Sequence, residues 1–149
     1  MIKNLIIREY TSNDKDKVLA ILKLNVPKYF AKSEIDDFEN YLTHKIEKYF
    51  VAAFGGEIIG AGGINFDDNS ETAKISWGFI DTQFKGIGIG QSLLKYRIDF
   101  IKSNYNAKTI KVRTSQLAYK FYEKNGFTLK KIEKDYWAAG FDLYSMSYE

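Results

Sequence analysis

The chain has 149 residues, the length of one ordinary domain, and we expect residues 1–149 to form a single domain. Hydrophobic residues make up 45% and charged residues 28% of it, a balance typical of globular proteins and not of disordered ones. The net charge is only +3, and the absence of cysteine excludes a disulfide framework, a thiolate zinc site and a cysteine nucleophile.

The first elements expected along the chain are a strand and a helix. Residues Leu5–Glu9 are rich in β-forming side chains and predict the first strand. Thr11 or Ser12 can cap the helix that follows, and Pro27 ends it. Its apolar stripe is expected to consist of Val18, Leu19, Ile21 and Leu22.

A second helix and a hairpin are expected next. Ser33, with Asp36 three residues later, predicts an acidic variant of the capping box at the start of this helix. Its apolar positions at helical spacing are Ile35, Phe38, Tyr41, Leu42, Ile46 and Tyr49. Residues 50–54 and 57–65, on either side of Gly55-Gly56, predict a β-hairpin.

The C-terminal half alternates strands and helices. After a turn at residues 67–70, the pattern predicts a strand at 72–80, a helix at 88–103, a strand at 109–113, a helix from Ser115 to Asn125-Gly126, and two strands within 128–148, the last at 141–147. We therefore predict an α/β (α+β) fold in which a mixed central sheet of about six to seven strands is flanked by about four helices.

Three glycines separate the strand ending near Ile80 from the helix that follows, in the sequence KGIGIG at residues 85–90. Glycines at alternate positions let the backbone turn sharply, so that free N–H groups and the positive end of the helix dipole converge on one spot. Such a spot suits a phosphate or pyrophosphate. The mononucleotide P-loop requires a lysine that Gln91-Ser92 does not supply, and the dinucleotide fingerprint fails in register.

The spacing of Lys85, Gly88 and Gly90 resembles the Arg/Gln-x-x-Gly-x-Gly/Ala loop of the GCN5-related N-acetyltransferase (GNAT) superfamily. A second segment, SQLAYKFYEKNGF at 115–127, is similar to that family's Asn-x-x-Ala-x-x-Phe-Tyr-x-x-x-Gly-Phe motif. Three positions depart from the family pattern: Lys85 replaces Arg or Gln, Thr82 stands where proline is frequent, and Ser115 replaces Asn.

The resemblance implies a single GNAT-like domain that transfers an acetyl group from acetyl-CoA to a primary amine by direct attack. It assigns acetyl-CoA binding to Phe79, Ile80, Lys85, Gly86, Ile87, Gly88, Ile89, Gly90, Gln91, Ser115 and Tyr119. A backbone N–H near Phe79 or Ile80 is expected to polarise the thioester carbonyl. Tyr122 stands at the family's general-acid position, and a phenol with a pKa of about 10 is protonated at neutral pH.

A general base is harder to assign, because the strand before the glycine loop carries no carboxylate. Glu57, Asp68 and Glu71 acting through water are weak candidates, and the lone His44 is expected to be a surface or packing residue. The alternative to an enzyme is therefore a non-catalytic acyl-CoA-binding or regulatory module of the same fold. No metal is expected.

The acceptor pocket is expected over the first two helices and the loop between them. Asn25, Tyr29, Phe30 and Trp77 could shape it, and Glu34, Asp36 and Asp37 could attract a cation. The acceptor is a small-molecule amine or a peptide amine, and the lack of a charged recognition tail leans toward the small molecule.

The remaining expectations concern partners and location. The scattered basic residues predict no nucleic-acid partner. The N-terminus does not resemble a signal peptide and no segment is apolar enough to span a bilayer, so we expect no membrane partner and a cytoplasmic protein. The 11 Tyr, 11 Phe and 2 Trp predict either a lined pocket or a subunit contact, such as that of a homodimer.

Overall fold

The computed structural model describes residues 3–67 and 70–148, so Asp68 and Asn69 of the predicted turn lie outside the described residues. The strands are β1 (Leu5–Glu9), β2 (Lys48–Phe54), β3 (Glu57–Asp67), β4 (Thr72–Ile80), β5 (Thr109–Thr114), β6 (Phe127–Ala138) and β7 (Phe141–Tyr148). The helices are α1 (Lys15–Leu24), α2 (Glu34–Asn40), α3 (Ile89–Asn104) and α4 (Tyr119–Lys124). Short turns η1 (Ser12–Asp14) and η4 (Thr82–Phe84) and a π-helical turn η2 (Tyr41–Lys45) complete the chain.

The strands form one mixed sheet in the order β1-β2-β3-β4-β5-β7-β6. Strands β4 and β5 are parallel, whereas the other described neighbours are antiparallel. The order of elements and the α/β class are those predicted from the sequence. None of the helices in the described residues combines the length and the apolar character needed to cross a membrane.

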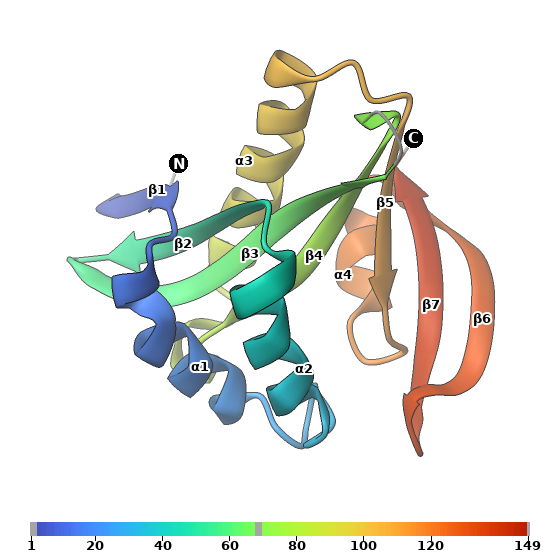
Figure 1. Ribbon diagram of the computed structural model, residues 1–149, viewed down its shortest axis with the longest axis horizontal. Helices are drawn as coiled ribbons and strands as arrows, with labels where there is room; N and C mark the ends of the chain where they lie inside the picture. The colour runs from blue at the N-terminus through green and yellow to red at the C-terminus, as the bar shows by residue number, and fades with distance from the viewer. Residues whose placement is uncertain (1–2, 68–69, 149) are drawn as a thin grey trace.

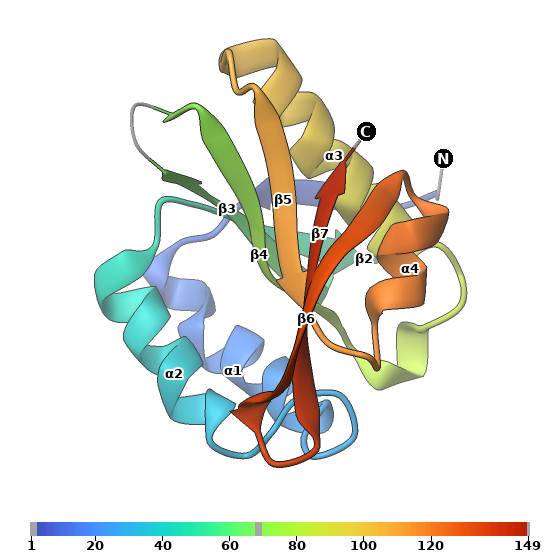
Figure 2. The ribbon, with the colours of Figure 1, turned by 90° about the vertical axis from the view of Figure 1, so that its right-hand side faces the viewer.

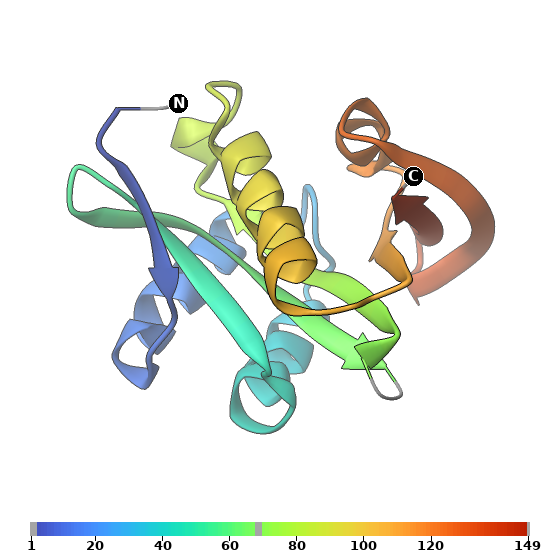
Figure 3. The same cartoon turned by 90° about the horizontal axis from the view of Figure 1, so that it is seen from above.

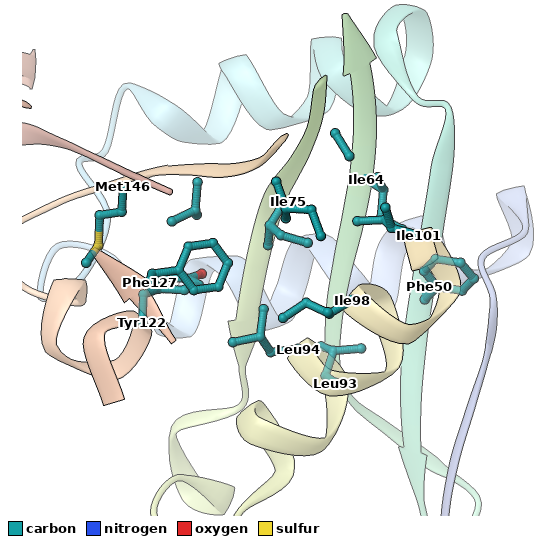
Figure 4. Packing of buried hydrophobic residues seen from close by; sticks show 13 residues of the cluster. Phe50, Ile64, Ile75, Leu93, Leu94, Ile98, Ile101, Tyr122, Phe127 and Met146 are labelled. Carbon is teal, nitrogen blue, oxygen red and sulfur yellow. The ribbon is translucent and has the colours of Figure 1, made fainter. Parts of the chain in front are cut away.

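Helices cover both faces of the central strands. Helices α1 and α2 lie on one face and α3 on the other, with α4 beside β6 (Figures 1, 2 and 3). Because successive strand residues point to opposite faces, each face has its own core. Phe50, Ile64 and Ile75 pack under α3 with Leu93, Leu94, Ile98 and Ile101 (Figure 4), whereas Tyr49, Val51, Ala61 and Phe79 pack under α1 and α2.

The start and the end of the second helix differ from the prediction. Ser33 has a helical backbone and its side chain makes no capping hydrogen bond, so the predicted box with Asp36 is wrong. Instead, the carboxylate of Glu34 accepts a hydrogen bond from the Ala31 N–H at 2.8 Å. At the other end, the helix terminates in the π-helical turn η2. Tyr49 belongs to β2, where its ring packs in the core between the sheet and helices α1 and α2.

The helix predicted to open at Ser115 begins four residues later, at Tyr119. The Ser115 hydroxyl accepts a hydrogen bond from the Leu117 N–H at 3.2 Å, and the Ser115 carbonyl accepts from Ala118 and Tyr119. Serine satisfies local backbone groups in this way and thereby favours a turn over a continuous helix. The segment after β5 is therefore a turn that returns the chain to the open end of the sheet.

Strands β4 and β5 form a fork at that open end. Their pairing runs from Thr72 and Thr109 to Ile75 and Val112, although β4 continues to Ile80. In the same stretch β4 has a bulge against β3, because the register with β3 shifts between the pairs Gly63–Ser76 and Ala61–Phe79. Trp77 in the bulge has a positive φ of 44°, a conformation that costs energy in a residue with a Cβ atom. The bulge therefore turns the end of β4 away from β5.

Candidate active site

A cavity of about 480 Å³ opens at the fork between β4 and β5. Ten residues singled out as site candidates from the sequence line it together: Asn25, Tyr29, Phe30, Glu34, Asp37, Trp77, Phe79, Lys85, Ser115 and Tyr122. They come from the α1–α2 segment, the end of β4, the glycine loop, the turn after β5 and α4. The fold thus brings five parts of the chain to one place.

The Tyr122 side chain is 8% exposed and lines this cavity. Its ring packs edge-on against Phe121 and Phe127, with centroids 5.1 and 5.6 Å away, at one end of the cluster in Figure 4. Burial raises the pKa of the Tyr122 hydroxyl, and the charge of Arg97 partly opposes this rise. The hydroxyl forms no hydrogen bond with another residue of the described ranges. It is therefore a neutral proton donor available to a ligand.

The glycine loop has the conformation that an anion cradle needs. Gly86 and Gly88 have left-handed φ values of 83° and 94°, and Gly88 is the residue from which α3 starts. The first-turn N–H groups of a helix have no partner within the helix, so those following Gly88 can bind an anion. A Cβ at Gly90 would make an ordinary 3.5 Å contact with Phe121. The shape of the loop therefore depends on its first two glycines.

The other residues predicted to bind acetyl-CoA do not line the cavity: Ile80, Gly86, Ile87, Gly88, Ile89, Gly90, Gln91 and Tyr119. The Ile89 side chain is buried with Ala52 and Ile59, so it anchors the start of α3 and leaves its backbone N–H for a ligand. The Tyr119 ring packs on Tyr144, with centroids 4.8 Å apart. Lys85 belongs to the glycine loop and also lines the cavity. Its ammonium lies 3.4 Å from the ring centroid of Tyr29, which is another lining residue.

The residues expected to shape the acceptor pocket divide into two kinds. Phe30 stacks on Trp77 with centroids 6.2 Å apart, and the two rings line the cavity. The Asn25 side chain is buried and donates to the carbonyls of Ile21 and Ile80, both at 3.0 Å, so it ties α1 to the end of β4. Phe30 and Trp77 form a contact surface, whereas Asn25 also has a structural task.

Acidic side chains reach the cavity from α2. Glu34 and Asp37 line it, whereas Asp36 does not. Burial raises the pKa of Glu34, the N–H of Ala31 counteracts this rise, and the nearby charge of Asp37 adds to it. The carboxylate of Glu34 is thus a better proton acceptor than one in water, and both acids favour a cationic ligand.

The described base candidates named from the sequence, Glu57, Glu71 and His44, do not line the cavity. Glu57 forms an exposed ion pair with Lys17 at 3.2 Å, and Glu71 forms one with Lys108 at 3.5 Å. Neither lines the cavity, and His44 is exposed at the end of η2. Asp68 lies outside the described residues.

Sequence reasoning missed Arg97, which is 2% exposed on the inner face of α3. A signal was present: Arg97 follows Leu93 and Leu94 at helical spacing and precedes Ile98 and Ile101, so it interrupts an otherwise apolar stripe. An arginine within an apolar stripe either reaches solvent through a local distortion of the helix or is buried because its charge has a role.

Comparison with known proteins agrees with this geometry. Residues 11–149 match the model of the acetyltransferase (GNAT) domain family. An N-alpha-acetyltransferase of Sulfolobus acidocaldarius is 29% identical over 97% of this chain and 92% of its own length. The N-alpha-acetyltransferase of Sulfurisphaera tokodaii is 28% identical over 95% and 90%.

Among solved structures, Arabidopsis thaliana Naa50, in complex with the bisubstrate analogue CoA-Ac-MVNAL, superposes with a TM-score of 0.76. It is 18% identical and covers 98% of this chain and 99% of its own, so it supports the fold. The family model, by contrast, spans nearly the whole chain and includes both the glycine loop and the segment of Tyr122. The chain therefore belongs to the GNAT acetyltransferase family and is an acetyl-CoA-dependent acetyltransferase.

Proposed function

We propose that residues 1–149 form one N-acetyltransferase domain that acetylates the α-amine at the N-terminus of a polypeptide. The observation that carries this acceptor is the absence of a carboxylate from the described part of β4 at the fork. At pH 7, freeing a lysine-like amine of its proton costs about 4.6 kcal/mol, whereas an α-amine costs about 1 kcal/mol. An α-amine therefore needs little help from a base.

The comparisons support the same acceptor. Both curated relatives named above are N-alpha-acetyltransferases and match this chain over nearly its full length. The sequence alone leaned toward a small-molecule amine, because the chain lacks a charged recognition tail. A cavity with acidic groups and stacked aromatic rings offers recognition without such a tail.

The residues fit acetyl-CoA as the co-substrate. The structural observation that supports this fit is the left-handed conformation of Gly86 and Gly88. In this proposal, the N–H groups after Gly88 and the charge of Lys85 hold its pyrophosphate, while Phe79 and Ser115 border the arm that enters the fork. Bound acetyl-CoA supplies the acetyl group as a thioester. Tyr122 then gives its hydroxyl proton to the departing sulfur, and Glu34 and Asp37 attract the amine.

An acceptor panel tests the proposal. Thiol release from acetyl-CoA is measured with peptides that have a free α-amine, with N-terminally blocked peptides that contain lysine, and with small amines. We expect release with the first group, and mass spectrometry should place the acetyl group on the first residue. Transfer to lysine or to small amines alone would overturn the acceptor. If no amine in the panel caused thiol release from acetyl-CoA, the alternative of a non-catalytic acyl-CoA-binding module would be favoured.

The stacked rings of Phe30 and Trp77, which line the cavity, give a second prediction. Phe30→Ala should raise the KM for a peptide acceptor about 5- to 20-fold, because the variant removes the ring that stacks on Trp77 and lines the cavity. The KM for acetyl-CoA should stay within about twofold. Steady-state kinetics with each substrate varied in turn measure both values.

The matched control for this prediction is Phe66→Ala. Phe66 is also half-buried and packs on another ring, that of Tyr105, but it does not line the cavity. We expect the peptide KM of this variant to equal that of the wild type. Equal peptide KM values for the Phe30 and Phe66 variants would contradict the placement of the acceptor.

A further inference from the structure

The guanidinium of Arg97 is buried between α3 and the sheet without a carboxylate beside it. Its Nε donates to the Leu93 carbonyl at 3.3 Å, and Nη1 donates to the carbonyls of Gly63 at 3.2 Å and Ser76 at 3.5 Å. Arg97 takes part in no ion pair within the described ranges. A buried cation is costly, and an apolar side chain of similar size often fills such a place at lower free energy. The charge itself therefore calls for an explanation.

Glycines on two strands make the room for this guanidinium. A Cβ at Gly62 would lie 2.6 Å from Arg97 Cζ, and a Cβ at Gly78 would lie 3.0 Å from Nη2. Gly62 faces the β4 bulge that contains Trp77 and Gly78. The sheet is thus built around the arginine at the position where its regular pairing is interrupted.

The bulge is held from both faces of the sheet. From the α3 side Arg97 donates to the Ser76 carbonyl, and from the opposite side the Tyr49 hydroxyl donates to the Trp77 carbonyl at 2.8 Å. A bulge leaves backbone carbonyls without strand partners, and buried carbonyls need donors. Arg97 therefore helps to fix the end of β4 that carries Phe79 into the cavity.

Among the described residues, the titratable groups that interact electrostatically with Arg97 are tyrosine hydroxyls: those of Tyr122 of α4, Tyr49 of β2 and Tyr41 of η2. Tyr49 donates to Trp77, and Tyr41 bonds Asn65 at 2.9 Å. Tyr41 and Tyr122 both line the cavity, but of the three only Tyr122 has no hydrogen-bond partner in the described part of the chain. The field of Arg97 thus acts on the one hydroxyl of the three that a ligand can use.

We propose that Arg97 is a positioning residue for acetyl transfer: its guanidinium locks the β4 bulge and stabilises the negative charge left on Tyr122 Oη when that hydroxyl gives up its proton. This inference rests on the proposed role of Tyr122. As the C–S bond breaks and the N–C bond forms, the Oη proton passes to the sulfur. The attacking amine loses a proton to solvent, and Tyr122 regains one from solvent.

Arg97→Met and Arg97→Lys test the inference. We expect Arg97→Met to lower kcat about 10- to 30-fold with an acetyl-CoA KM within about threefold of wild type, because charge and not volume is removed. Its Tm should change little, because relief from burying a charge offsets the donor that the carbonyls of Gly63 and Ser76 lose. Arg97→Lys keeps the charge and should recover most of kcat. Lys95→Met, which removes an exposed charge from the same helix, should behave as wild type.

A double-mutant cycle with Tyr122→Phe tests the coupling. If Arg97 acts through Tyr122, Arg97→Met should cost much less kcat in the Tyr122→Phe background than in the wild type. Should Arg97→Met not fold, Gly62→Ala, which displaces the guanidinium without removing it, carries the same cycle.

Three outcomes would overturn the inference: an Arg97→Met kcat within threefold of wild type, additive losses in the cycle, or equal losses in Arg97→Met and Arg97→Lys that follow a lower Tm. A slow Tyr122→Phe variant beside a fully active Arg97→Met variant would remove the inference and leave the proposed function standing. A wild-type protein without any acetyl transfer would remove the proposed function itself.

Discussion

Tyr122→Phe should lower kcat about 10²- to 10³-fold and leave the affinity for acetyl-CoA within about twofold, the loss expected for a missing general acid. The hydroxyl lines the cavity, and burial raises its pKa, so that it is protonated throughout the neutral range. The ring contacts with Phe121 and Phe127 involve no oxygen and persist in the variant. The loss should therefore appear in turnover and not in folding or cofactor binding.

The measurement combines thiol-release kinetics on a peptide acceptor with calorimetric titration of acetyl-CoA. Tyr96→Phe is the matched control: it also removes a hydroxyl, but from an exposed ring on α3 that does not line the cavity. Its kcat should equal that of the wild type. If the Tyr122→Phe protein also turned over at the wild-type rate, the proton would have to come from another group or from water.

The order of the elements was predictable because its signals are local. The strand Leu5–Glu9 and the strand Thr72–Ile80 have the predicted bounds, and the Gly55-Gly56 turn joins β2 and β3 as expected. The error at the second helix lies where two local signals compete. The spacing of Ser33 and Asp36 predicts a cap there, but the Glu34 carboxylate accepts the N–H of Ala31, three residues earlier, instead.

The site has one part that is local in sequence and another that forms only when distant segments meet in the fold. The turn at the glycine loop could be predicted from the sequence, because its conformation depends on the backbone of six consecutive residues. The meeting of Glu34, Asp37 and Tyr122 in one cavity could not, because it depends on how α2 and α4 are placed around the fork. Arg97 was hidden for a related reason: its burial depends on glycines of β3 and β4, which are distant in sequence.

Replacing both Gly86 and Gly88 by alanine should weaken acetyl-CoA binding about 30- to 100-fold. Both residues have left-handed φ values, and an L-residue with a Cβ pays about 1–2 kcal/mol for each. No atom outside the immediate neighbours lies within 4 Å of a Cβ at Gly86, so the effect there is conformational and not steric. The chain can relieve the strain by moving the loop out of the cradle geometry, and the ligand must then restore it.

Calorimetric titration gives the dissociation constant, and thermal unfolding shows whether the fold is affected. The matched control is the double variant Gly55→Ala/Gly56→Ala, because these residues also have positive φ, at 59° and 88°, and open surroundings, but they form the β2–β3 turn. It should share the loss of stability and keep the wild-type affinity for acetyl-CoA. If the loop variant bound acetyl-CoA within threefold of the wild type, the N–H groups after Gly88 would not hold the pyrophosphate. At saturating acetyl-CoA its kcat should approach the wild-type value, because Tyr122 and the cavity at the fork are unchanged.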